Sequence, residues 1–170
     1  GPQVPNTLDK KFFLKHPYVD MAVHGEGEIT FSEILKRLHR SEDIHNIPGT
    51  TFFDRGSSQK LFFNTSRERI KNLEILPSPY LDGTFDRLAN RFPDLCWVPV
   101  WETNRGCPFQ CTFCDWGSAT ASKLRKFNLD RLFDEVDYFS RKRIDLIFCS
   151  DANFGILPRD KDIARRLAEN

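Results

Sequence analysis

Hydrophobic residues recur at spacings that predict strands and helices near both ends of this 170-residue chain. In the first part, residues 19–23 form a short apolar run typical of a buried strand, and a Gly-rich turn follows at 25–28. Residues 29–40 are predicted to form an amphipathic helix, because apolar side chains recur at helical spacing at Phe31, Ile34, Leu35 and Leu38.

The last part of the chain predicts a parallel sheet with crossover helices. Residues 97–102 read as a strand, which Pro99 would confine to the edge of a sheet. A helix with Asn128 as its N-cap follows, and the continuous apolar run 144–149 is typical of a strand covered on both faces. Another helix opens near Asp160. Strands that alternate with helices in this order favour parallel pairing with right-handed crossovers.

The middle of the chain has a different character. Turn signals recur between residues 46 and 95, and the apolar segments 52–53 and 61–63 indicate a β-hairpin. We interpret this part as a connector between two domains rather than as a second core. The predicted organisation is therefore 1–45, the connector 46–95, and 96–170, and both outer parts read as pieces of larger domains.

Charge and composition narrow the class of protein. The chain has 25 Lys and Arg against 24 Asp and Glu, so we expect no surface for nucleic acid or for an anionic membrane. We expect no signal peptide, and no apolar run reaches membrane-spanning length. Five cysteines are an odd number, which fits reduced thiols better than a disulfide framework. We therefore expect a soluble, cytoplasmic protein.

Three of the cysteines, Cys107, Cys111 and Cys114, fall within eight residues. A [4Fe–4S] cluster normally takes four thiolates, so three would leave one iron open to an external ligand. A zinc site with Cys149 or a histidine as the fourth ligand is an alternative, and a disulfide with a spare thiol is another. Otherwise Cys96 and Cys149 are expected to be buried apolar residues.

The segment 107–114 reads CPFQCTFC and resembles the CxxxCxΦC signature of radical S-adenosylmethionine (SAM) enzymes. The resemblance implies that Cys107, Cys111 and Cys114 hold a [4Fe–4S] cluster whose open iron chelates SAM. It implies that one electron, supplied by an external reductant, cleaves SAM to a 5′-deoxyadenosyl radical that abstracts hydrogen from a substrate. It also implies an adenine contact at the backbone of Phe113.

Further SAM contacts are expected from residues around this loop. Many members of the family carry Gly-Gly-Glu after their second strand, where it binds the methionine amine, and this chain has Asp151 and Asn153 at that place. The resemblance makes both side chains candidates to accept a hydrogen bond from the amine. Lys123 and Arg125 lie in a basic run that is either a solvated face or a holder for the SAM carboxylate. Trp116 either shields the cysteines from solvent or packs ordinarily.

The Gly-Glu turn carries a second resemblance. Alone, it predicts a tight turn with an acidic helix N-terminus. The segments GPQVP, VHGEGEITFSEIL and LPSPYLDGTFD resemble radical SAM enzymes in which a cobalamin-binding domain precedes the barrel. The resemblance implies cobalamin between the two domains, with Gly25, Glu26 and Gly27 near the corrin. His24 is interpreted as a structural residue rather than as a cobalt ligand.

Together the resemblances imply an α/β fold. It would comprise the C-terminal edge of a Rossmann-like cobalamin-binding domain (1–45), a connector (46–95), and the first two β/α units of a radical SAM partial (β/α)6 barrel (96–170). The implied reaction is cobalamin-dependent methyl transfer to an unactivated small-molecule or peptide substrate. Cyclisation or oxidation with the same cofactors, and a non-catalytic zinc or iron–sulfur module, are the alternatives. The 170 residues alone are expected to be inactive, because the barrel is incomplete.

Overall fold

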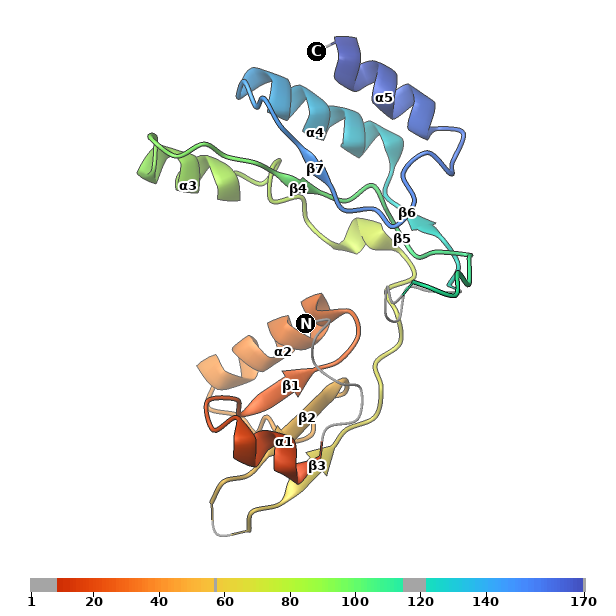
Figure 1. Ribbon diagram of the computed structural model, residues 1–170. Coiled ribbons are helices and arrows are strands. Elements are labelled where there is room, and N and C mark those ends of the chain that lie inside the picture. The colour runs from red at the N-terminus through yellow and green to blue at the C-terminus, as the bar shows by residue number, and fades with distance from the viewer. Residues whose placement is uncertain (1–8, 57, 115–121, 170) are drawn as a thin grey trace. The chain divides into compact units, whose positions relative to one another are not determined.

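The computed structural model describes residues 9–56, 58–114 and 122–169, and it divides the chain into two compact units, Gly1–Ile70 and Lys71–Asn170 (Figure 1). Each unit has its own strands and its own buried side chains. No helix in the described ranges is both long and apolar enough to cross a membrane. Trp116 and the segment 1–5, which the resemblances above include, lie outside the described residues.

The first unit contains a three-stranded antiparallel sheet in the order β1–β2–β3. The strands are β1 (Met21–Val23), β2 (Thr50–Phe53) and β3 (Leu61–Phe63). The predicted hairpin is confirmed, because β2 pairs with β3 and places Phe52 opposite Phe62. On the other side of β2, Thr51 stands opposite Ala22 of β1. The central strand is therefore paired along both edges.

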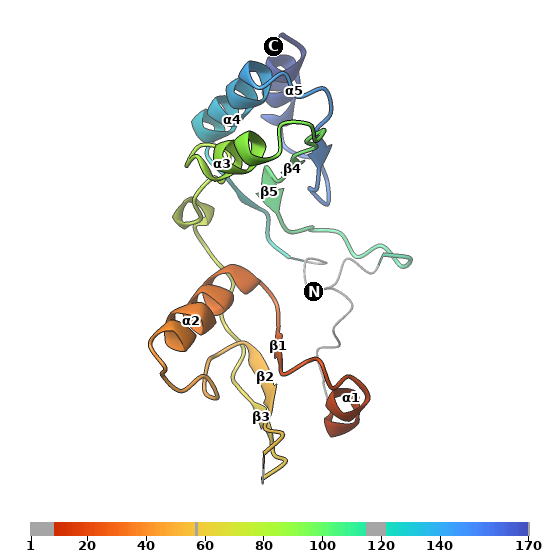
Figure 2. The same cartoon turned by 90° about the vertical axis from the view of Figure 1, so that its left-hand side faces the viewer.

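Two helices lie on opposite sides of this sheet (Figure 2). On one side, α1 (Lys10–Lys15) packs Phe13 against Ala22 of β1 and Phe53 of β2. The rings of Phe13 and Phe53 are stacked with their centroids 5.7 Å apart. Phe13 is fully buried, and these three side chains form one hydrophobic cluster of the unit.

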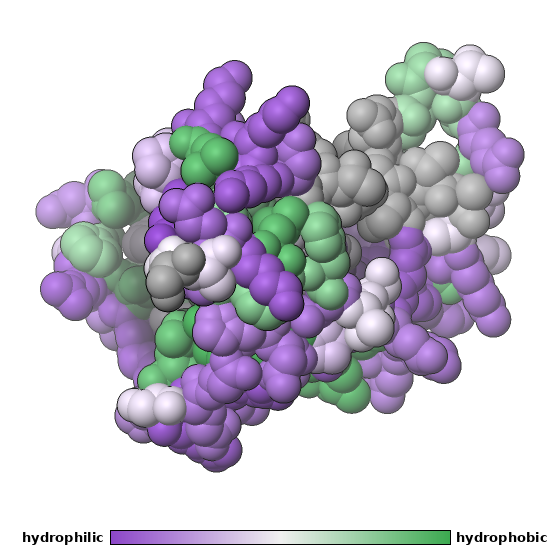
Figure 3. All heavy atoms as spheres, turned by 90° about the horizontal axis from the view of Figure 1, so that it is seen from below, coloured by the Kyte–Doolittle hydropathy of each residue, from purple (hydrophilic) through white to green (hydrophobic). Residues whose placement is uncertain are grey.

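On the other side, α2 (Gly27–His39) is the predicted amphipathic helix, and it begins two residues earlier than expected. Only part of its apolar stripe is buried among the described residues. Thr30 and Ile34 are buried, whereas about half of each remaining stripe side chain is exposed, at 55%, 51% and 53% for Phe31, Leu35 and Leu38. Apolar surface is also visible among hydrophilic side chains in the view from below (Figure 3).

The compact units divide at a different place from the predicted domain boundaries. Residues 46–70 supply β2 and β3, which are hydrogen-bonded to β1, so they belong with the preceding segment rather than with a separate connector. The backbone pairs of a sheet are long-range contacts that turn signals alone do not reveal. The division falls after Ile70, and residues 71–95 join the second unit.

The second unit is built around two parallel strands, β4 (Val100–Trp101) and β7 (Phe148–Cys149). Between them runs α4 (Leu129–Arg141), capped by Asn128 as predicted, and α5 (Asp160–Glu169) follows β7. The predicted order of strand, helix, strand and helix with parallel pairing is therefore confirmed. The smaller elements of this unit are the 3₁₀ turn η1 (Leu73–Ile75), α3 (Thr84–Arg91), β5 (Asn104–Arg105) and β6 (Arg125–Lys126).

The parallel pair is covered on one face only in the part of the chain that is described. Trp101 of β4 is buried and meets Phe139 of α4 edge to face. On the opposite face Val100, Leu146 and Phe148 are each more than half exposed. The prediction that 144–149 is covered on both faces is therefore wrong for these residues, because α4 packs against a single side.

A buried carboxylate ties α4 to β4. Glu135 is only 2% exposed. Its Oε2 accepts a hydrogen bond from the Trp101 indole N–H at 2.6 Å, and its Oε1 accepts one from Arg131 Nε at 3.1 Å. A buried charge is tolerated when it is paired and hydrogen-bonded in this way.

Replacing Glu135 should therefore destabilise the protein strongly. We expect Glu135→Ala to lower the free energy of unfolding by about 3 kcal/mol. The substitution leaves the Arg131 charge without its counter-charge and the buried Trp101 indole N–H without an acceptor. Asp137→Ala is the matched control: Asp137 lies on the same helix as Glu135, and its ion pair with Arg166 of α5 is half-exposed. Its loss should cost less than about 1 kcal/mol. Thermal or denaturant unfolding measures both. Equal losses would contradict the buried network.

His24 fastens the end of β1 to the neighbouring strand. Its backbone N–H donates to the Gly49 carbonyl at 2.8 Å, and its Nε2 lies 2.8 Å from the Thr51 hydroxyl. Burial lowers the pKa of the His24 imidazole from its ordinary value. These contacts agree with the interpretation of His24 as a structural residue.

The lowered pKa gives His24 a defined effect on stability. The unfolded chain binds a proton at His24 more readily than the folded chain, so its contribution is present above about pH 6.5 and is lost as the pH falls below that value. We expect His24→Gln, which keeps a polar partner for Thr51, to show a smaller fall in melting temperature than wild type between about pH 7.5 and about pH 5.5. Parallel pH profiles of the two proteins would rule this out.

Candidate functional site

The three clustered cysteines lie on a loop that leaves the carboxyl end of β4 and returns through a short stem. The stem strands β5 and β6 are antiparallel, with Asn104 opposite Lys126. Beyond them, the Ser122 N–H donates to the Cys107 carbonyl at 2.7 Å, and the Cys107 N–H donates to the Ser122 hydroxyl at 3.3 Å. The stem therefore extends as far as the first cysteine.

Gly106 allows the two sides of the loop to approach at this point. Its φ is 108°, and a Cβ built on it would lie 2.6 Å from the carbonyl oxygen of Lys123. The clash is with backbone rather than with a flexible side chain, so a larger residue would force the stem apart. Both the conformation and the close approach require glycine.

The cysteines differ in how firmly they are held. Cys107 is buried in the stem, whereas Cys111 and Cys114 are exposed and are joined by a turn in which the Cys114 N–H donates to the Cys111 carbonyl at 3.1 Å. All three are free thiols, which does not support the disulfide alternative. Phe113, between them, is 90% exposed.

Three thiolates on one loop are ligands of the type that both iron–sulfur clusters and zinc sites use. Within the described ranges, no three His, Cys, Asp or Glu side chains gather closely enough to hold one metal ion. A zinc ion needs its ligands in one coordination sphere, whereas a cubane cluster spreads its thiolates over several irons. Cys149, the suggested fourth zinc ligand, is half-buried opposite Trp101, and burial raises the pKa of its thiol. Cys96 is exposed rather than buried as expected.

Asp151 turns its carboxylate back toward the residues that begin the loop. Oδ1 accepts hydrogen bonds from the backbone N–H groups of Thr103 at 2.7 Å and Asn104 at 3.2 Å. Oδ2 accepts from the Thr103 hydroxyl, and from the Asn104 side-chain amide at 2.8 Å. A carboxylate accepts about four hydrogen bonds. The acceptor sites of Asp151 are therefore filled from within the chain.

Two amide groups near this edge of the sheet have unused hydrogen-bonding capacity. The Nδ2 of Asn153 and the Oδ1 of Asn104 are buried without a hydrogen-bond partner among the described residues. Asn104 itself is 1% exposed. Buried polar atoms are rarely left unpaired, so each such atom calls for an explanation. A ligand with both donor and acceptor groups would satisfy them.

Arg159, which was not among the predicted site residues, holds both sides of the stem base. Its guanidinium donates to the Phe127 carbonyl and, at 2.8 Å, to the Thr103 carbonyl. The Phe127 N–H also donates to Thr103 O at 3.1 Å. Burial lowers the pKa of Arg159, and the carboxylates of Asp160 and Asp151 oppose that effect. A positive charge directly before a helix is unfavourable to the helix dipole. The place of Arg159 before α5 was therefore the sequence signal that this arginine has another role.

The predicted basic residues lie on the returning side of the same loop. Lys123 is exposed, and Arg125 is half-buried in β6 opposite Arg105. The Nε of Arg105 donates to both carboxylate oxygens of Glu102, at 2.9 and 2.7 Å. The structure therefore brings Lys123 and Arg125 onto the same loop as the cysteines.

The Gly-Glu turn belongs to the first unit. Gly25 has a φ of 68°, which favours glycine, and a Cβ there would meet no described atom within 4 Å. A Cβ on Gly27 would make only an ordinary contact of 3.7 Å with Val23, so packing in the described part does not require a glycine. Glu26 is engaged, because its Oε2 accepts from the Ile70 N–H at 2.7 Å.

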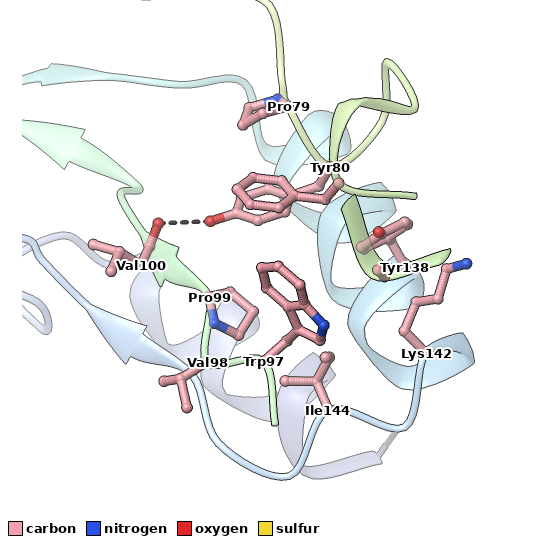
Figure 4. Close-up of a pocket in the computed structure, with 11 residues that line it drawn as sticks. Pro79, Tyr80, Trp97, Val98, Pro99, Val100, Tyr138, Lys142 and Ile144 are labelled. Carbon is pink, nitrogen blue, oxygen red and sulfur yellow. Dashed lines mark hydrogen bonds between the residues drawn. The ribbon is translucent and has the colours of Figure 1, made fainter. Parts of the chain in front are cut away.

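A cavity of about 450 Å³ lies beside the chain that enters β4 (Figure 4). Tyr80 donates its hydroxyl hydrogen to the Val100 carbonyl at 2.6 Å, and burial raises the pKa of Tyr80 to about 12. The cavity lies at the amino-terminal side of β4, whereas the cysteine loop leaves its carboxyl side. Its walls are mostly apolar: Pro79, Tyr80, Phe85, Ala89, Trp97, Val98, Pro99, Val100, Tyr138, Lys142 and Ile144.

Several known proteins are similar to this chain in sequence or in fold. No protein-family model matches the chain. Over 99% of its length it is 47% identical to the cobalamin-dependent radical SAM methyltransferase TokK of Streptomyces tokunonensis. It is 45% identical, over the same share, to the 2-(S-pantetheinyl)-carbapenam-3-carboxylate methyltransferase of Streptantibioticus cattleyicolor. The chain spans about a quarter of the length of these relatives, 25% of each.

Solved structures show the same fold. The cobalamin-dependent S-adenosylmethionine radical enzyme OxsB, with aqua-cobalamin and S-adenosylmethionine bound, matches with a TM-score of 0.61 at 24% identity, over 94% of this chain and 22% of that one. The radical S-adenosylmethionine methyltransferase TsrM of Kitasatospora setae, with cobalamin and [4Fe–4S] cluster bound, matches with a TM-score of 0.60 at 14% identity, over 92% and 31%. Across nearly its whole length the chain is therefore similar to two methyltransferases, one of which is a cobalamin-dependent radical SAM enzyme.

Proposed function

We propose that this chain is the part of a cobalamin-dependent radical SAM methyltransferase that supplies the ligands of the iron–sulfur cluster. The observation that carries the proposal is the position of Cys107, Cys111 and Cys114 on a loop at the carboxyl end of a strand in a parallel β/α arrangement. In such folds ligands bind outside the carboxyl ends of the strands. Three thiolates are one fewer than a closed cluster uses, which leaves an iron for SAM.

For SAM itself, the unpaired amides at the same edge are the best candidates. Asn153 offers an N–H donor and Asn104 a carbonyl acceptor, which suit a carboxylate and an amine respectively. The exposed backbone at Phe113 is the proposed adenine contact. Lys123 and Arg125, on the returning side of the loop, are proposed to face the SAM carboxylate or a substrate anion.

For the domain arrangement, we propose that the first unit is the C-terminal edge of a Rossmann-like cobalamin-binding domain. The second unit would form the first two β/α units of the partial (β/α)6 barrel. The turn at Gly25, Glu26 and Gly27 supports this assignment, because Gly27 has no packing reason to be glycine in the described part. A flat macrocycle could then approach the backbone closely.

In the proposed reaction, the bound cluster would supply the electron that cleaves SAM to a 5′-deoxyadenosyl radical, and cobalamin would carry the methyl group. The residues of the chain bind and orient. The stem fixes Cys107, the unpaired amides hold the polar end of SAM, and the basic residues counter its carboxylate. The electron would come from an external one-electron reductant, and the substrate would be a small molecule or a peptide.

Methyl transfer is favoured over cyclisation or oxidation because both relatives named above are methyltransferases. A zinc-binding structural module is disfavoured because the described residues offer no gathered set of ligands for a single ion. It predicts zinc bound by four protein ligands and no affinity for SAM.

The test is anaerobic iron–sulfur reconstitution of the full-length protein, followed by EPR of the reduced cluster with and without SAM. We expect a [4Fe–4S]⁺ signal that changes when SAM is added, and 5′-deoxyadenosine as a product. Cys107→Ala, Cys111→Ala and Cys114→Ala should each abolish the signal. Cys96→Ala, at an exposed cysteine outside the loop, should leave it intact. Tightly bound zinc, or a cluster whose spectrum ignores SAM, would overturn the proposal.

The tight approach at Gly106 gives a second test of the loop. We expect Gly106→Ala to lower the iron content after reconstitution, because its Cβ would collide with the Lys123 carbonyl. Gly83→Ala is the matched control: Gly83 also has a positive φ, of 81°, but a Cβ there meets no described atom within 4 Å. Iron and sulfide assays on both variants separate two effects: Gly106→Ala adds a steric clash to backbone strain, whereas Gly83→Ala adds backbone strain alone. Equal iron contents would show that the close approach does not matter.

A further inference from the structure

We infer that Asp151 and Arg159 are positioning residues that clamp the base of the cysteine loop from the neighbouring β/α unit. The first strand supplies the loop, and the segments after the second strand hold it in place. This inference rests on the proposed function only in assigning a cluster to the loop. It replaces the expectation that Asp151 contacts SAM.

Both oxygens of the Asp151 carboxylate accept their hydrogen bonds from within the chain. It receives two backbone N–H groups on one oxygen, and the Thr103 hydroxyl with the Asn104 amide on the other. Thr103 is fully buried and Asn104 is 1% exposed, so water does not compete for these donors. A SAM amine would have to displace one of them. The geometry therefore assigns Asp151 to the loop base rather than to the ligand.

Arg159 completes the clamp on the opposite side of Thr103. Its planar guanidinium reaches the carbonyls of Thr103 and Phe127, which lie on the outgoing and returning sides of the stem. A single rigid fork therefore spans both sides of the loop. Lysine offers a point charge on a flexible chain and cannot reproduce that geometry.

The clamp acts on Cys107 through a short, continuous path. The stem begins at Asn104, and its two sides come close together at Gly106. Cys107 then makes two hydrogen bonds with Ser122, both through the Cys107 backbone. Cys111 and Cys114 are exposed, and the Cys114 N–H donates to the Cys111 carbonyl in a turn. A shift at the base would therefore move Cys107 relative to the strand ends where SAM is proposed to bind.

The test uses Asp151→Asn and Arg159→Lys in the full-length protein. Asp151→Asn keeps the shape but places an amino group against two donors, and Arg159→Lys keeps the charge but loses the fork. Asp137→Asn and Arg166→Lys are the controls, because they make the same two replacements in an ion pair, with contacts of 2.7 Å, that lies away from the loop. Melting temperatures identify any variant that fails to fold.

The first readout needs no cluster. In the apo protein, alkylation followed by mass spectrometry should show that Cys107 reacts more slowly than Cys111 and Cys114. Asp151→Asn and Arg159→Lys should raise the rate at Cys107 on the order of tenfold, the effect expected from losing hydrogen bonds to a charged group. The control variants should leave it unchanged. A wild-type labelling rate at Cys107 in both loop variants would overturn the inference, whether or not the protein binds a cluster.

The second readout distinguishes positioning from direct contact in the reconstituted protein. We expect the loop variants to lose iron to a chelator on the order of tenfold faster than wild type, with an altered EPR signal before SAM is added. In Arg159→Lys, which leaves the hydrogen bonds of Asn104 in place, the SAM affinity of the loaded fraction should stay near wild type. Wild-type iron retention and SAM-free EPR, combined with weakened SAM binding in Asp151→Asn, would make Asp151 a ligand contact and overturn the inference. Failure of wild type to take up any cluster would overturn the proposed function instead.

Discussion

The parallel pairing of β4 with β7 is the constraint on which the second unit depends. Trp101 stands opposite Cys149, so the residues after both strands emerge at the same edge of the sheet. Thr103 and Asp151 are 48 residues apart in the chain, yet their hydrogen bond is 2.7 Å long. A parallel pair requires a crossover, and α4 provides it while covering Trp101. The polar edge and the apolar core thus follow from one pairing.

Much of the architecture could be predicted because it is local. The spacing of apolar residues located α2, α4 and α5. Turn signals and the apolar segments 52–53 and 61–63 located the hairpin of β2 and β3. The spacing of apolar residues does not show which surface each of them packs against. Phe31 fits the helical stripe of α2 yet is 55% exposed. The division after Ile70 was also missed, because strand pairing is a long-range property.

The same distinction applies to the candidate site. The cysteines were found by their spacing, because a metal-ligating residue can be recognised from the identity of its side chain. The hydrogen bonds of Asp151 and Arg159 to the base of the loop could not be predicted. Their partners include backbone groups such as Thr103 N–H and Phe127 O, and nearly every residue carries such groups. Gly106 was missed for a related reason: the atom that excludes a side chain there is the carbonyl oxygen of Lys123.

The contrast between a braced stem and an open tip has a consequence for maturation. Cys107 reaches its place through hydrogen bonds that the polypeptide makes by itself, while Cys111 and Cys114 stay accessible from outside. A scaffold of this kind can fold first and receive iron and sulfide afterwards, unlike small metal domains that fold only around their ion. The order of biogenesis would then run from chain to cofactor.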